Sequence, residues 1–196
     1  MKKEKINYID IKDEGYSDFA WSGWIDVTYR CDLSALYNRK RERFFVLCDR
    51  WAKFCSLIAG GAAFSTFLST VEQKAMAGVI VSAVTLPSLL FNWTERARLH
   101  GELANKYLKL RADISRVGSR QFTQENINDW RAELYLIEQS EPSILSAVLA
   151  ECNNHIASRE HESENVISLS LRQKLFAHIF DTHIDWPHGK SPKDDL

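Results

Sequence analysis

Two neighbouring segments without a charged side chain constrain this chain more than any other feature. Residues 54–71 and 75–93 are 18 and 19 residues long and are separated only by Glu72-Gln73-Lys74. As helices rising about 1.5 Å per residue, they would be roughly 27–29 Å long, close to the ~30 Å hydrocarbon thickness of a bilayer. Both are apolar on every face, unlike the one-sided stripe of a soluble surface helix. The sequence therefore predicts a transmembrane helical hairpin, 54–93, with a three-residue turn.

The alternative is a pair of helices buried in a soluble core. Two adjacent uncharged spans are hard to bury in a chain of 196 residues, whereas helices in lipid satisfy their own backbone hydrogen bonds. The mean hydropathy of −0.29 and the net charge of −1 are averages over the whole chain. They therefore do not reveal that about 40 strongly apolar residues are embedded in a much longer polar sequence. A pI near 6.6 argues against bulk electrostatic binding of nucleic acid.

Basic residues gather at the outer ends of the two uncharged segments. They are Arg39, Lys40, Arg41, Arg43, Arg50, Lys53, Arg96 and Arg98. The positive-inside rule then places both chain ends in the cytoplasm and the Glu72–Lys74 turn outside (N-in/C-in). Trp51 and Trp93 fall at the two cytoplasmic span ends, where indole rings anchor at the membrane interface.

The remaining chain shows helical periodicity and no strand alternation, so the predicted fold class is all-α. The expected parts are a flexible leader (1–18), a cytosolic helical region (19–53), the hairpin (54–71 and 75–93), a cytosolic helical hairpin (94–140), C-terminal helices (141–185) and a disordered tail (186–196). Asp32 or Ser34 is expected to break or cap the first helix, and Thr123 to cap the helix after Gly118-Ser119. Pro142 is expected at a first helical position, and a last helix over about Asn165–Asp181.

An apolar stripe at coiled-coil spacing follows the second uncharged segment. Its members are Leu99, Leu103, Tyr107, Leu110, Ile114 and Val117. We expect this seam to continue the membrane helix and either to assemble copies of the chain or to pack on the N-terminal helix.

Small and polar residues share one face of the second segment, among them Gly78, Ser82, Thr85 and Asn92. Such a face packs helices within the hairpin or between copies, or lines a water-filled path in a homo-oligomer. Pro87 should bend this helix, since it removes one backbone hydrogen bond. The absence of charge in the spans argues against a proton-coupled transporter or a voltage sensor.

Motifs for enzyme chemistry are weak. Arg172 and His178 fit the Arg-polar-x4-His form of the all-α HEPN ribonucleases, but most such pairs are solvated helix residues. Cys152, His155, His161 and Glu162 do not have the spacing of a zinc site, and the four cysteines match no redox motif, so we expect reduced thiols, no metal and no cofactor. No cleavable signal peptide is expected.

The order of these features resembles the SLATT family of two-span membrane domains. The resemblance covers about residues 20–140 and lies in Tyr37 with the following run Arg39-Lys40-Arg41, the two linked spans, and the segment ARLHGEL that begins at Ala97 and is followed by Tyr107. It implies a non-enzymatic effector of the bacterial inner membrane in antiphage defence. Such an effector forms pores when a partner or nucleotide-signalling system triggers it, or anchors a cytosolic defence partner without conducting.

Overall fold

The computed structural model describes residues 18–60, 70–72, 75–76, 78–79, 82–83, 91–119, 121–160 and 166–186. Its labelled elements are α1 (Asp18–Gly60), α4 (Trp93–Val117), α5 (Gln124–Glu138), α6 (Ser146–Glu160) and α7 (Leu171–Phe176). Over this part of the chain the predicted all-α fold is confirmed. Among the same residues, no helix combines the length and the apolar character that crossing a membrane requires.

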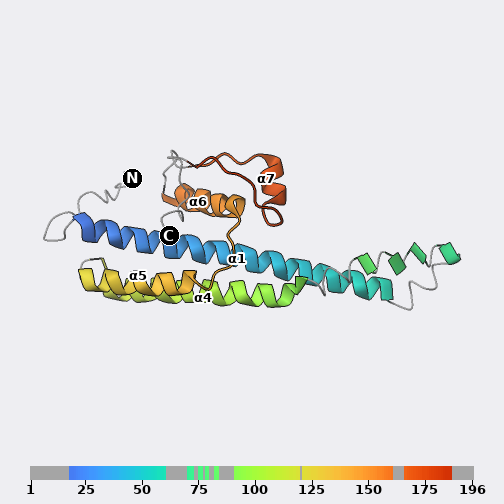
Figure 1. Ribbon diagram of the computed structural model, residues 1–196, viewed down its shortest axis with the longest axis horizontal. Helices are drawn as coiled ribbons and strands as arrows, with labels where there is room; N and C mark the ends of the chain where they lie inside the picture. Colours follow the sequence, from blue (N-terminus) through green and yellow to red (C-terminus); the bar gives the residue numbers. More distant parts are fainter. Residues whose placement is uncertain are drawn as a thin grey trace, which may run out of the picture.

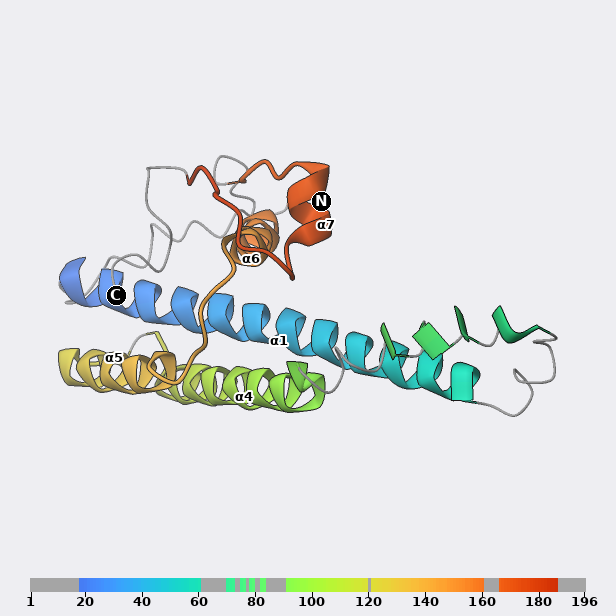
Figure 2. The same cartoon turned by 45° about the vertical axis from the view of Figure 1, so that its right-hand side comes forward.

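α1 is the axis of an elongated molecule. The helices α4 and α5 lie along one side of it, and α6 and α7 lie on the opposite side (Figures 1 and 2). α1 also continues past the beginning of α4, toward the residues of the uncharged segments (Figure 1). Because α1 is one helix of 43 residues, it connects the α4–α5 layer and the α6–α7 layer to the end of the molecule that carries the uncharged segments.

The expected interruption of the first helix at Asp32 or Ser34 is wrong. Both residues lie inside the continuous helix α1. Asp32 accepts a hydrogen bond from Arg111 of α4 at 3.2 Å, and Ser34 is fully buried. Packing on two sides of α1 thus overrides the weak capping tendency of these side chains.

The seam that follows the second uncharged segment lies in the core between α1, α4 and α5. Leu103, Tyr107, Leu110 and Ile114 are at most 1% exposed, and their cluster includes α1 residues such as Val27 and Cys31. Burying each such side chain stabilises the fold by about 1.5–3 kcal/mol. Of the two expected uses of the seam, the structure shows packing within one chain.

A second apolar core lies on the other side of α1. Leu33 and Tyr37 of α1 pack there with the buried face of α6. The segment after α6 adds Ile167, Ala177 and Ile184 to the same cluster. Residues 166–186 therefore belong to the folded body, although α7 itself has only six residues.

The seam helix does not run straight on from the second uncharged segment. Asn92 has φ 45° and ψ 54°, a left-handed conformation that ends a helix, and α4 begins at Trp93. Asparagine tolerates this conformation better than most residues. The hydroxyl of Thr94 donates to Asp49 at 3.1 Å, which sets the start of α4 beside α1 near Trp51.

Other helix ends agree with the sequence in part. Thr123 caps α5 through a capping box with Asn126, and α4 ends at Gly118 with φ 79°, both as predicted. Pro142 does not begin a helix, because residues 141–145 connect to α6, which starts at Ser146. The last helix is much shorter than the predicted Asn165–Asp181, because the Ser170 capping box starts it at Leu171 and a turn follows Phe176.

Candidate functional site

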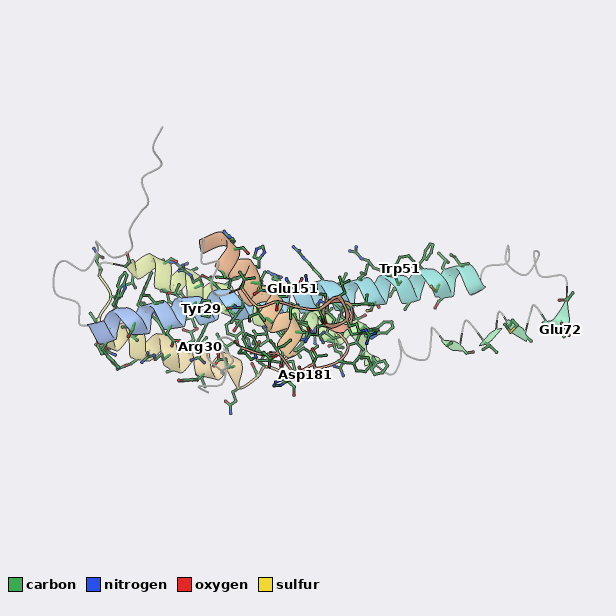
Figure 3. The ribbon with its side chains drawn as sticks, turned by 90° about the horizontal axis from the view of Figure 1, so that it is seen from above. Tyr29, Arg30, Trp51, Glu72, Glu151 and Asp181 are labelled. Carbon is green, nitrogen blue, oxygen red and sulfur yellow. The ribbon has the colours of Figure 1, made fainter. Side chains whose placement is uncertain are left out.

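The end of α1 presents a continuous apolar face, which we call the α1 apolar face. Its residues recur at helical spacing, so they lie on one side of the helix. They are Leu47 (54% exposed), Trp51 (58%), Phe54 (51%), Leu57 (74%) and Ile58 (46%). Figure 3 shows Trp51 on this part of α1, and Glu72 lies beyond the helix end. Large apolar side chains that gather in this way mark an interaction surface.

The predicted basic residues precede or adjoin the beginning of this face, and half of them pair with acidic side chains. Nearest to it, Lys53 contacts Asp49 at 2.6 Å, while Arg50 is exposed. Further ion pairs are Arg39–Glu42, Lys40–Glu151 and Arg98–Glu95, and Arg43 and Arg96 are exposed. Positive charge therefore remains at the level where the α1 apolar face begins.

Arg41 differs from the other basic residues because it is buried, with 8% of its surface exposed. Its guanidinium group donates to the backbone oxygen of His178 at 2.6 Å. It also lies over the rings of Phe45 and Phe44, at 4.6 and 5.6 Å from their centroids. Within the described residues no carboxylate pairs with it, and its Nε–H has no hydrogen-bond acceptor.

Two histidines extend this arrangement into what we call the Arg41 stack. The His178 ring stacks on Phe44 at 4.7 Å with planes 7° apart, and the His100 ring stacks on Phe45 at 5.6 Å and 14°. The stack joins the segment after α7, the middle of α1 and the start of α4. Cation–π contacts of a desolvated arginine contribute about 2 kcal/mol, so the stack fixes the C-terminal segment to α1.

Burial and positive neighbours keep both histidines neutral. Burial, together with the charge of Arg41, lowers the pKa of His100 from 6.5 to about 4, and Arg96 adds to the effect. The pKa of His178 falls to about 4 for the same leading reasons, burial and Arg41. Burial also lowers the pKa of Arg41, with the nearby Arg96 contributing.

A buried polar network adjoins the stack. Asn38, which is fully buried, donates through its amide nitrogen to Glu141 at 2.6 Å and to the Ser34 carbonyl at 3.0 Å. Its amide oxygen therefore faces His100 Nδ1 at 2.7 Å, which requires the proton of the neutral imidazole on Nδ1. Tyr107 donates to the other Glu141 oxygen at 3.2 Å. The network connects α1, α4 and the link before α6.

Further polar groups in the body also hold helices together. Arg30 and Glu138 form a buried ion pair between α1 and α5, with an N–O distance of 2.6 Å and side chains 8% and 6% exposed. Tyr29 of α1 donates to Asn153 of α6. All four cysteines are free thiols, and burial raises the pKa of Cys31 and of Cys152 to about 12. These two thiols therefore remain protonated and are poor nucleophiles.

An open cleft of about 550 Å³ lies between α1, α4 and α6. Two of its polar lining groups are already engaged within the chain. Arg39 donates to Glu42 and Asn105, at 2.8 and 2.7 Å, and Asp32 accepts from Arg111. The other lining residues are Ala35, Leu36, Leu108, His155, Ile156 and Arg159.

The remaining predicted site residues are placed as follows. Ser82 is exposed and donates to the Gly78 carbonyl at 2.9 Å, whereas Thr85 and Pro87 lie outside the described residues. Arg172 is exposed, and the His178 ring belongs to the Arg41 stack. Leu99 is 40% exposed, and Val117 packs at the edge of the core. His161 and Glu162 also lie outside this part of the chain, in which no group of three or more His, Cys, Asp and Glu could hold a metal ion.

Neither the Arg41 stack nor the exposure of the apolar residues around α7 was predicted from the sequence. Arg41 and His178 are 137 positions apart, and Arg41 appears in the sequence as one of several basic residues. The adjacent pair Phe44-Phe45 beside a basic run is the one local signal that could have indicated a stacked arginine.

Comparisons with protein-family models, with curated proteins and with solved structures find no match to this chain.

Proposed function

We propose that this protein is a membrane effector whose hairpin, residues 54–93, crosses the lipid bilayer while the helical body stays on the cytoplasmic side. The observation that carries the proposal is the α1 apolar face. From Leu47 to Ile58 it exposes large apolar side chains to the surroundings, and the sequence carries no charge from Phe54 to Val71. Lipid is the partner that satisfies such a surface together with two uncharged segments of bilayer length.

The position of α4 supports the same arrangement. The Thr94–Asp49 hydrogen bond sets the beginning of α4 beside α1, so Trp51 and Trp93 lie at similar depth on the two helices. Arg50 and Lys53 lie at this level on α1. Interfacial indoles next to basic residues are typical of the cytoplasmic boundary of a membrane protein.

One hairpin cannot enclose water, so permeabilisation requires several copies in the membrane. Because the seam from Leu103 to Ile114 is buried within one chain, its buried positions cannot form the contacts between copies while the body stays folded. We propose that copies meet through the small-residue face of the second span, at Gly78 and Ser82. The resemblance to the SLATT family suggests antiphage defence as the setting and a partner or signal as the trigger.

No observation favours the ribonuclease alternative. The His178 ring is stacked on Phe44 and held by Arg41, so its position is explained by packing. Its pKa of about 4 makes it a poor general acid at neutral pH. The remaining alternative is a membrane scaffold that does not conduct and that anchors a cytosolic partner.

A leakage assay separates the effector from the scaffold. The full-length protein is reconstituted into vesicles of phosphatidylethanolamine and phosphatidylglycerol that contain a small fluorescent dye. An effector releases the dye with a dose dependence steeper than first order, because several copies are needed, and Gly78→Leu with Ser82→Leu reduces the release at equal incorporation. Leu136→Gln, on the exposed surface of α5, serves as the control variant. Protein that incorporates fully and releases no dye would leave the scaffold as the function.

A further inference from the structure

A second group of exposed apolar side chains surrounds α7, far in sequence from the hairpin. Its residues follow helical and turn spacing along one short segment, and Phe176 and Phe180 contact each other with ring centroids 6.1 Å apart. We call the group the C-terminal patch. It consists of Leu171 (86% exposed), Leu175 (75%), Phe176 (43%), Ile179 (57%) and Phe180 (60%). The body of the protein buries Ala177 of this segment and leaves these larger side chains uncovered.

The charged side chains within the patch are basic, and the first acidic residue after it, Asp181, accepts a hydrogen bond from the Ser146 N–H. Between residues 166 and 180 the charged side chains are Arg172 and Lys174, both exposed. Basic residues beside a small apolar surface are the composition of elements that lie in the boundary between lipid headgroups and acyl chains. Each basic residue near an anionic membrane contributes about 1 kcal/mol of attraction.

The Arg41 stack determines where the patch lies along α1. His178, next to Ile179 of the patch, contacts Arg41 and Phe44. Trp51 follows Phe44 by seven residues, which is about 10 Å along a helix. A headgroup layer is roughly 5–8 Å thick, and interfacial elements bury about 5–10 Å into the boundary. The patch therefore lies about 10 Å along α1 from the level of Trp51, a distance comparable with the depth of this layer.

Further contacts hold the segment in this position. The backbone N–H of Ser146 donates to Asp181 at 2.9 Å, and the Ile167 N–H donates to Asn154 of α6 at 2.7 Å. Within the segment, Gln173 donates to the His183 carbonyl at 3.2 Å. Figures 1 and 2 show α7 beside α6, level with the middle of α1 and on the side of α1 opposite α4 and α5. The patch is thus presented by a fixed element at one side of the helical body.

We propose that the C-terminal patch docks on the anionic surface of the same bilayer leaflet from which the hairpin enters, and so forms a second, interfacial membrane contact. This inference rests on the proposed function, because it needs the hairpin to be in the membrane. The helical body is then attached to the membrane at two points. The hairpin crosses the bilayer, and the C-terminal patch contacts the surface of the leaflet beside it.

Three fluorescent probes on full-length protein test this contact. Single cysteines replace Leu57 in the hairpin, Leu175 in the patch and Leu136 on α5, all of which are exposed, in a chain with Cys48→Ser and Cys55→Ser. The other two cysteines, Cys31 and Cys152, are buried. Each variant carries an environment-sensitive dye and is reconstituted into phosphatidylglycerol-containing vesicles with lipids that bear a quencher near the headgroup.

The expected result is strong quenching at positions 57 and 175 and at least threefold weaker quenching at position 136. Equal quenching at 175 and 136, with position 57 quenched, overturns the interfacial contact and leaves the proposed function standing. Weak quenching at all three positions overturns the proposed function as well. Disulfide formation between copies of the unlabelled Leu175→Cys protein, together with no quenching of the labelled protein, would show that a second copy covers the patch instead.

A charge variant tests the preference for anionic lipid. Arg172→Glu with Lys174→Glu should reduce quenching at position 175 at least twofold in phosphatidylglycerol vesicles and change it little in vesicles of phosphatidylcholine alone. Lys106→Glu with Lys109→Glu, on the exposed surface of α4, is the matched control. Equal loss of quenching in both vesicle types would contradict an electrostatic role for the two residues.

Discussion

Arg41 shows how a single residue can serve a role that its neighbours in the sequence do not share. Arg39, Lys40 and Arg43 lie at the surface or pair with carboxylates, whereas Arg41 is buried against Phe44, Phe45 and the His178 carbonyl. Removing a buried charge from water without a carboxylate partner is costly. The aromatic rings and the charged hydrogen bond offset this cost and join the C-terminal segment to α1.

We therefore predict that Arg41→Leu releases residues 166–186 while the rest of the body stays folded. The hydrogen bond to His178 and the ring contacts are lost, and limited proteolysis should cut this segment at least tenfold faster. The melting temperature of the α1–α4 core should fall by only a few degrees. Arg43→Leu, at an exposed position of the same turn, is the control and should leave the cleavage rate unchanged. Equal cleavage rates for the two variants would contradict this role of Arg41.

The two neutral histidines predict the pH dependence of stability. In the unfolded chain a histidine titrates near 6.5, whereas His100 and His178 titrate at about 4 in the folded protein. Between these values the unfolded chain binds more protons, so stability is full above pH 6.5 and decreases as the pH falls toward 4. For His100 the loss is on the order of 3 kcal/mol.

Thermal unfolding between pH 7.5 and 4.5 measures this effect. His100→Asn keeps a donor toward Asn38 and cannot titrate, so its melting temperature should depend less on pH. His155→Gln replaces an exposed histidine and should behave as the native chain does. A His100→Asn variant with the native pH slope would show that His100 does not carry the effect.

The buried pair of Arg30 and Glu138 allows a double-mutant cycle. Glu138→Leu leaves the buried Arg30 guanidinium without the carboxylate that it contacts and should lower the free energy of unfolding by about 3–5 kcal/mol. Arg30→Met combined with Glu138→Leu should recover most of that loss, because no uncompensated charge remains. Denaturant unfolding of the two single variants and the double variant measures the coupling. Additive losses would indicate that the ion pair is not coupled.

At the scale of elements, the packing of α4 on α1 determines which variants of the seam are informative. Leu103→Glu with Leu110→Glu places two carboxylates in positions at most 1% exposed, and the body should fail to fold. Leu99→Glu with Leu108→Glu, at positions 40% and 43% exposed on the same helix, should remain folded. Circular dichroism and thermal melting distinguish the two. A folded Leu103/Leu110 variant with a smaller assembly size would instead show that the seam joins copies.

The features that were predicted correctly from the sequence are helix ends and a helix stripe that depend only on residues close together in the chain. Thr123 and Gly118 act through neighbouring backbone groups, and the seam repeats at a period that one helix defines. The start of α6 depends instead on distant partners, since Tyr37 accepts from the Leu145 N–H and Asp181 from the Ser146 N–H. These contacts stabilise the non-helical link after Pro142, and no local pattern reports them.

In the candidate site, too, the features set by neighbouring residues were predictable and those set by distant partners were not. The uncharged segments and the basic residues around them are visible in the order of the residues along the sequence, because bilayer length and charge bias need no tertiary information. The Arg41 stack and the C-terminal patch could not be predicted, since they depend on which face of residues 166–180 the body covers. The left-handed Asn92 was also missed, because the helical period continues across it in the sequence.

At the scale of the whole molecule, α1 runs through the helical body and continues toward the uncharged segments (Figure 1). The layer of α4 and α5 and the layer of α6 and α7 both pack on it. A shift or tilt of α1 would therefore displace both layers relative to the hairpin. In the proposed function, a partner that binds the body can act on the membrane segments through this one helix.

The position of Glu72 tests the central claim most directly. Cysteine is introduced at Glu72 or at Leu136 in the Cys48→Ser, Cys55→Ser chain, and bacterial spheroplasts that express each variant are treated with a maleimide that cannot cross membranes. The proposed topology predicts labelling at position 72 in intact spheroplasts and labelling at position 136 only after lysis. Equal labelling of both positions before lysis, or protein that is extracted into buffer without detergent, would contradict the proposed hairpin.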